Sequence, residues 1–128
     1  MACCFTELII DGRDLHRLAD FWCEVLDYRV LDQTAEAVEI GAAELTADDA
    51  RRAPVVPTLV FVPVPEGKTV KNRVHIDVSP IDRSQQEEVD RLLALGATRV
   101  DIGQGDVSWV VMTDPEGNEF CVLRSLQA

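Results

Sequence analysis

The sequence predicts an α+β fold made of two copies of a βαβββ unit. Two amphipathic helical patterns occur, and each follows one strand pattern and precedes three others. The two halves also align without gaps, so that Phe5 matches His75 and "VLDYRV" (25–30) matches "LGATRV" (95–100). A chain of 128 residues, 47% of them apolar, can bury one core. We therefore predict a single domain over 1–128, with modules at about 1–66 and 72–126.

The first half begins with "CFTELIID" (4–11), whose alternation of apolar and polar residues is typical of a half-buried strand. A helix should follow, capped by Asp11 or Asp14. Its apolar stripe should face a sheet; it consists of Leu15, Leu18, Phe21, Trp22 and Val25. Three further strands are predicted, around the loop "TADDARRAP" (46–54): "YRVLDQ" (28–33), "AVEIG" (37–41) and "PTLVFVPV" (57–64).

The second half repeats this order. "RVHIDVSP" (73–80) predicts a strand, and Ser84 with Glu87 predicts a capping box at the start of a helix that ends near Gly96. Between the last two strands, "DPEG" (114–117) is a typical turn sequence and predicts a hairpin. The last three strands should be "ATRVDI" (97–102), "VSWVVMT" (107–113) and "NEFCVL" (118–123).

Strand alternation predicts which polar side chains share a face of their strand. Phe5 and Glu7 should share one face of their strand, His75 and Asp77 one face of theirs, and Glu119 and Cys121 one face of the last strand. If these faces line one cleft, three carboxylates surround an imidazole and a general base or a cation site becomes possible. The alternative is that Glu7, Asp77 and Glu119 lie near strand ends and are solvated. Trp109 lies in mid-strand and could point either way.

Charge and composition exclude some classes of partner. There are 23 acidic and 12 basic residues, so the net charge of −11 should repel nucleic acid and anionic membranes. The start "MACCFTELII" resembles no export signal, and no apolar run is long enough to span a membrane, so we expect a cytoplasmic protein. The four cysteines show no CxxC spacing, and we expect them to be reduced.

The segments "LADFWCEVLDYRV", "KNRVHIDV", "LGAT" and "DPEGNEFCVL" resemble the vicinal oxygen chelate superfamily of glyoxalases, bleomycin-resistance proteins and extradiol dioxygenases. They are most similar to its small bacterial glyoxalase-like branch. The resemblance implies two βαβββ modules whose curled, mixed sheets surround a cleft that holds a small molecule. It also implies a homodimer.

In metal-dependent members, the resemblance implies His or Glu ligands on the first and last strand of each module. Here the matching residues in the first half are Phe5 and one of Val60, Phe61 and Val62, none of which can bind a metal. In the second half they are His75 and, in place of the usual glutamate, Cys121. The ligand set for a divalent metal is thus incomplete and no cofactor is expected; any metal would be held by His75 and Cys121.

Two functions follow from this resemblance. The first is binding of a small, partly apolar molecule in the cleft without a full metal site. The second is a metal-dependent lyase, isomerase or dioxygenase that uses His75. We identify no catalytic residue: Cys121 would need a neighbour that lowers its pKa, and His75 is the only candidate. The basic stretch Lys68, Lys71 and Arg73 is either a solvated loop or a means of attracting an anionic ligand. The predicted ligand-binding residues are Phe5, Glu7, Phe61, His75, Asp77, Trp109, Glu119 and Cys121.

Overall fold

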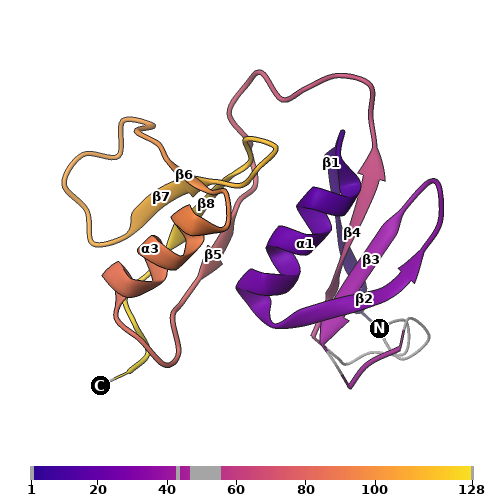
Figure 1. The fold of residues 1–128 in the computed structure, drawn as a ribbon, viewed down its shortest axis with the longest axis horizontal. Coiled ribbons are helices and arrows are strands. Elements are labelled where there is room, and N and C mark those ends of the chain that lie inside the picture. The colour runs from indigo at the N-terminus through magenta and orange to yellow at the C-terminus, as the bar shows by residue number, and fades with distance from the viewer. Residues whose placement is uncertain (1, 43, 47–55, 128) are drawn as a thin grey trace. The chain divides into compact units, whose positions relative to one another are not determined.

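The computed structural model describes residues 2–42, 44–46 and 56–127. The chain forms two compact units, 1–67 and 68–128, which are described separately below. Each has the βαβββ order that the sequence predicts, with one helix against one four-stranded mixed sheet (Figure 1). Among the described residues, neither helix is long and apolar enough to cross a membrane.

The first unit contains a sheet with the strand order β1-β4-β3-β2. β1 runs parallel to β4, and the other neighbours are antiparallel. The strands are β1 (Glu7–Gly12), β2 (Tyr28–Gln33), β3 (Val38–Ala42) and β4 (Thr58–Pro63). Residues 4–6 of the predicted first strand lie outside β1, and the predicted loop 46–54 falls almost wholly outside the described residues.

Helix α1 (Leu15–Leu26) forms where the apolar stripe predicts it. Of the two cap candidates, Asp14 is the one used: its Oδ1 accepts a hydrogen bond from Arg17 N at 3.2 Å. The helix ends at Asp27, which adopts a left-handed conformation with φ of 55°. Its buried residues are Leu18, Ala19, Phe21 and Trp22.

Strand register separates the two faces of the first sheet. Phe61 is paired with both Ile10 and Val38, so these three side chains share a face. Phe61 and Val38 are almost completely buried, as expected of the face that packs against α1. On the opposite face, Ile9 is 57% exposed. We call the face away from the helix the open face of each sheet.

The second unit has the equivalent strand order β5-β8-β7-β6, with β5 parallel to β8. Its strands are shorter than predicted: β5 (Ile76–Val78), β6 (Thr98–Arg99), β7 (Val110–Thr113) and β8 (Glu119–Val122). Helix α3 (Gln85–Ala94) starts with the predicted capping box, in which Ser84 and Glu87 exchange two hydrogen bonds. Gln85 Nε2 also donates to the carbonyl oxygen of Val122, which ties the start of the helix to β8.

The core of the second unit lies between α3 and one face of its sheet. Met112 and Phe120 are paired across β7 and β8 and are buried, as is Val122 on the same face. Val89 and Leu92 are the apolar residues that α3 buries completely. Phe120 and Val122 thus alternate with Cys121, as the sequence predicts.

The predicted hairpin turn between β7 and β8 is present. Asp114 is buried, and its Oδ1 accepts hydrogen bonds from the backbone N–H groups of Glu116 and Asn118, both at 2.9 Å. Gly117 has a φ of 90°, a value that residues with a side chain rarely adopt. This turn fixes the point at which β8 begins.

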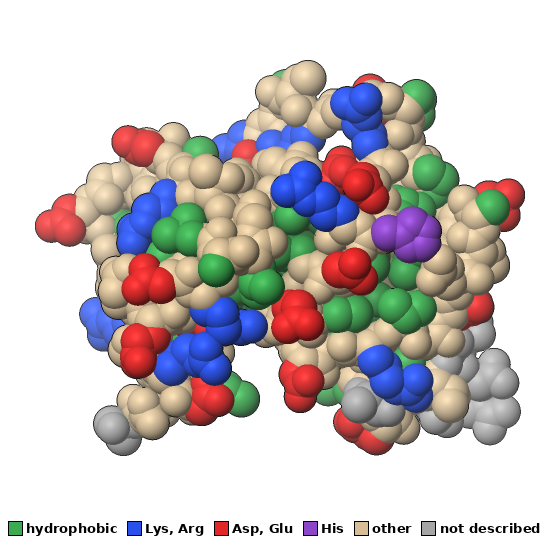
Figure 2. Space-filling view, in the orientation of Figure 1, with side chains coloured by type: hydrophobic (Ala, Val, Ile, Leu, Met, Phe, Trp, Pro, Cys, Tyr) green, Lys and Arg blue, Asp and Glu red, His purple; other side chains and the backbone are tan. Residues whose placement is uncertain are grey.

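The acidic side chains are not concentrated in one area of the face shown in Figure 2. Acidic and basic side chains are interspersed there, with apolar side chains between them. Charge of one sign therefore does not dominate the face shown there.

Candidate functional site

The open face of the second sheet brings together three residues with metal-binding or acid–base side chains. Asp77 on β5 is paired directly with Cys121 on β8, so the two side chains leave the same face. His75 lies just before β5 and, two residues from Asp77, projects to the same side. One ligand atom from each of His75, Asp77 and Cys121 lies within 4.8 Å of the others. We call these three residues the His-Asp-Cys cluster.

Within the cluster, the imidazole and the carboxylate are in direct contact. His75 Nε2 lies 3.2 Å from Asp77 Oδ1, and the two side chains are 45% and 49% exposed. An exposed pair of this kind contributes little to stability. It does leave a donor and an acceptor accessible to a ligand.

The Cys121 thiol is enclosed, because the residue is only 6% exposed. Desolvation by burial raises its pKa, and Asp77 raises the pKa further through its charge and a hydrogen bond, against an opposing effect of Lys71. The thiol is therefore protonated at neutral pH, and it is a poor nucleophile in this state. After burial, its acidic neighbour Asp77 has the largest influence on the pKa of this thiol.

Glu119 shares the open face with Cys121, but both of its carboxylate oxygens already accept hydrogen bonds within the unit. Its Oε1 accepts a hydrogen bond from Lys68 Nζ at 2.8 Å, and its Oε2 accepts one from Asn72 N at 3.0 Å. Burial opposes ionisation, but these hydrogen bonds outweigh it and hold the pKa of Glu119 below its ordinary value. Sequence reasoning missed this role of Lys68, because no local pattern links residues so far apart in the chain.

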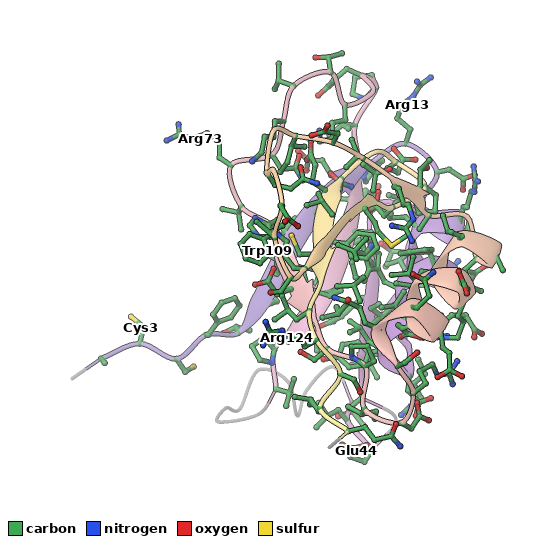
Figure 3. All side chains as sticks on the ribbon, turned by 90° about the vertical axis from the view of Figure 1, so that its left-hand side faces the viewer. Cys3, Arg13, Glu44, Arg73, Trp109 and Arg124 are labelled. Atoms are coloured by element: carbon green, nitrogen blue, oxygen red, sulfur yellow. The ribbon has the colours of Figure 1, made fainter. Side chains whose placement is uncertain are left out.

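Trp109 adds an apolar surface to the same face of the sheet, because it lies two residues before Val111, which pairs with Cys121. It lies immediately before β7, is 41% exposed, and is on the side of the second sheet away from α3 (Figure 3). Arg73, from the predicted basic stretch, points outward (Figure 3). The other two residues of that stretch have partners on β8. Lys68 donates a hydrogen bond to Glu119, and the charge of Lys71 acts to lower the pKa of Cys121.

The predicted site residues of the first unit do not all lie on its open face. Glu7 lies on β1 and shares the open face with Ile9, whereas Phe5 precedes β1 and is largely exposed. Phe61 does not fit the prediction that it lines the open face: its register places it on the helix side, where it is completely buried. The β4 neighbour that shares a face with Ile9 is Val60, an apolar residue.

The donors of the second unit fit some metals better than others. A histidine, a carboxylate and a thiol are ligand types that zinc accepts, and three protein ligands with one open position are typical of catalytic zinc sites. Manganese, magnesium and calcium prefer oxygen ligands, and the cluster offers a single carboxylate. No second group of three such donors occurs within the described residues.

Comparison with known proteins identifies the family. The family model for the glyoxalase-like domain matches residues 7–123. No curated protein matches the sequence significantly.

Several solved structures share the fold. A glyoxalase/bleomycin resistance protein/dioxygenase family enzyme from Burkholderia phytofirmans PsJN is 18% identical, with a TM-score of 0.59 over 91% of this chain and 94% of that one. The fosfomycin resistance protein FosX from Mesorhizobium loti is 15% identical, with a TM-score of 0.65 over 99% and 95%. A mutant of FosX from Listeria monocytogenes, in complex with Mn(II) and 1S,2S-dihydroxypropylphosphonic acid, is 13% identical, with a TM-score of 0.65 over 99% and 94%.

The structural matches are too distant in sequence to show more than the fold. The family model, by contrast, covers nearly the whole chain, including both βαβββ units. The chain therefore belongs to the glyoxalase-like domain family.

Proposed function

We propose that this protein binds a small, partly apolar organic molecule on the open face of its second sheet, without the complete metal site of metal-dependent relatives. The observation that carries the proposal is that Trp109, two residues before the Val111 that pairs with Cys121, lies on the same sheet face as the His-Asp-Cys cluster. A ligand site combines apolar contact area with a few polar groups that orient the ligand. Trp109 offers the first, and His75 and Asp77 offer the second.

The first unit supports the metal-independent part of the proposal. Phe5 has no ligand atom, and both Val60 and Phe61 on β4 are apolar. Glu39, the carboxylate paired with Val60, accepts a hydrogen bond from the hydroxyl of Thr58 at 2.8 Å. A four-ligand site drawn from the first and last strands of both units therefore lacks half of its ligands.

The proposal can be tested with a fluorescent probe in the presence of EDTA. Anilinonaphthalene sulfonate, which is partly apolar, should bind saturably and gain fluorescence. Trp109→Ala should weaken its binding about tenfold, the loss of roughly 1.4 kcal/mol of aromatic contact. Leu93→Ala is the matched control, because Leu93 lies on α3 and is 39% exposed, close to the exposure of Trp109.

Two results would contradict the proposal. One is binding that disappears when EDTA is added, because the protein would then need a metal to hold the probe. The other is an equal loss of affinity in Trp109→Ala and Leu93→Ala, because the probe would then bind exposed apolar side chains without regard to the site.

A further inference from the structure

The spacing of the His-Asp-Cys cluster is close to that of a tetrahedral metal site. With metal–ligand bonds of 2.0–2.3 Å, two ligands of a tetrahedral zinc ion lie about 3.3–3.7 Å apart. His75 Nε2 and Asp77 Oδ1 are already 3.2 Å apart, and all three ligand atoms lie within 4.8 Å. The two side chains that would have to move, His75 and Asp77, are about half exposed, so they are not fixed by packing in a core.

We infer that His75, Asp77 and Cys121 together bind one zinc ion on the second unit, with the fourth coordination position open to solvent or a ligand. This site differs from the arrangement implied for metal-dependent relatives, because all its ligands come from one unit and Asp77 is one of them. The inference is independent of the proposed function, since organic ligand binding is expected in EDTA.

The thiol determines which metal the site prefers. Thiolate is a soft ligand that favours zinc over manganese, magnesium and calcium. The one carboxylate in the cluster cannot replace the several oxygens that the harder ions require. The site should therefore hold zinc and discriminate against manganese.

Neighbouring contacts hold the ligands in place. The parallel pairing of β5 and β8 fixes Asp77 opposite Cys121. The hydrogen bonds from Lys68 and Asn72 to Glu119 attach the segment that leads to His75 to the start of β8. Because both carboxylate oxygens of Glu119 accept these hydrogen bonds, Glu119 does not serve as a fourth ligand.

Cobalt(II) is the probe that reports on the thiol directly. The full-length chain is titrated with cobalt under reducing, oxygen-free conditions, in a background of Cys3→Ser and Cys4→Ser because both of these thiols are exposed. One cobalt ion per chain should give a thiolate-to-cobalt charge-transfer absorption and the visible bands of a tetrahedral site. Added zinc should remove both signals, whereas an excess of manganese should not.

Variants assign the signal to the cluster. Cys121→Ser should abolish the charge-transfer absorption, and His75→Gln and Asp77→Asn should each weaken zinc binding at least about tenfold. The matched controls are His16→Gln and Cys23→Ser, which remove the other histidine and the remaining cysteine, which is partly buried. Circular dichroism confirms that each variant is folded, and the exposed His75 and Asp77 provide tests that do not disturb the core.

The inference is overturned if the chain binds no cobalt, or if the charge-transfer absorption persists in folded Cys121→Ser. It is also overturned if the controls lose as much zinc affinity as the cluster variants. Failure of zinc binding leaves the EDTA experiment with anilinonaphthalene sulfonate unaffected, so the two proposals fail separately.

Discussion

The open faces of the two sheets differ in chemistry although the sheets share one strand order. In the first unit, this face carries Glu7, the exposed Ile9 and the hydrogen-bonded pair of Glu39 and Thr58. In the second unit, it carries the His-Asp-Cys cluster, with Glu119 tied to Lys68. The two units thus share one strand order, but the second unit carries the described cluster of metal-binding and acid–base side chains.

The largest expected effect concerns the two faces of β8. Phe120→Ala should lower the free energy of unfolding by about 3–5 kcal/mol, because it leaves a cavity beneath α3. Cys121→Ser, one residue along on the open face, should cost much less. Urea denaturation of both variants measures the difference. If Cys121→Ser unfolds the protein and Phe120→Ala does not, the two faces are assigned the wrong way round.

A smaller effect should separate the carboxylates of the two open faces. Glu119→Ala should lower the free energy of unfolding by about 1–2 kcal/mol, because it removes hydrogen bonds from Lys68 and Asn72. Glu7→Ala in the first unit should change it by less than about 0.5 kcal/mol, because Glu7 makes no ion pair with the described part of the chain. Equal losses in urea denaturation would mean that the two faces are stabilised alike.

A pH-dependent effect is a loss of stability at alkaline pH that originates in the first unit. Burial and then the charges of Asp20 and Glu24 raise the pKa of Cys23 from 9.0 to about 11. The unfolded chain therefore loses this proton first, and stability should fall as the pH rises from about 9 to about 11. Cys23→Ala should flatten this slope in urea denaturation under reducing conditions. An unchanged slope would assign the alkaline loss to other groups, such as Tyr28 and Cys121, whose pKa values are also raised.

Local patterns predicted the fold well. The stripe from Leu15 to Val25, the capping box at Ser84 and the turn at Asp114 each depend on residues a few positions apart, and all three are present. The strands of the second unit are shorter than their apolar runs because strand ends depend on which backbone groups find partners across the sheet.

The site could be predicted only in part, for a related reason. Parity along β8 placed Cys121 opposite Phe120, and the structure confirms it. Parity does not tell which face of β4 packs against α1, so the prediction that Phe61 lines the open face is wrong, and Phe61 belongs to the core. The contact between Lys68 and Glu119 joins residues distant in sequence, and single-sequence patterns carry no signal for it.

The parallel pairing of β5 with β8 also has a consequence for folding. Because β5 and β8 are the first and last strands of their unit, α3, β6 and β7 must be synthesised before Asp77 meets Cys121. Contacts of such long range form slowly, because a large loop must close before they contribute any stabilisation. Until β8 is synthesised, a nascent chain therefore exposes an unpaired β5 edge. β8 completes the sheet of this unit, and truncation before β8 should leave a species prone to aggregation.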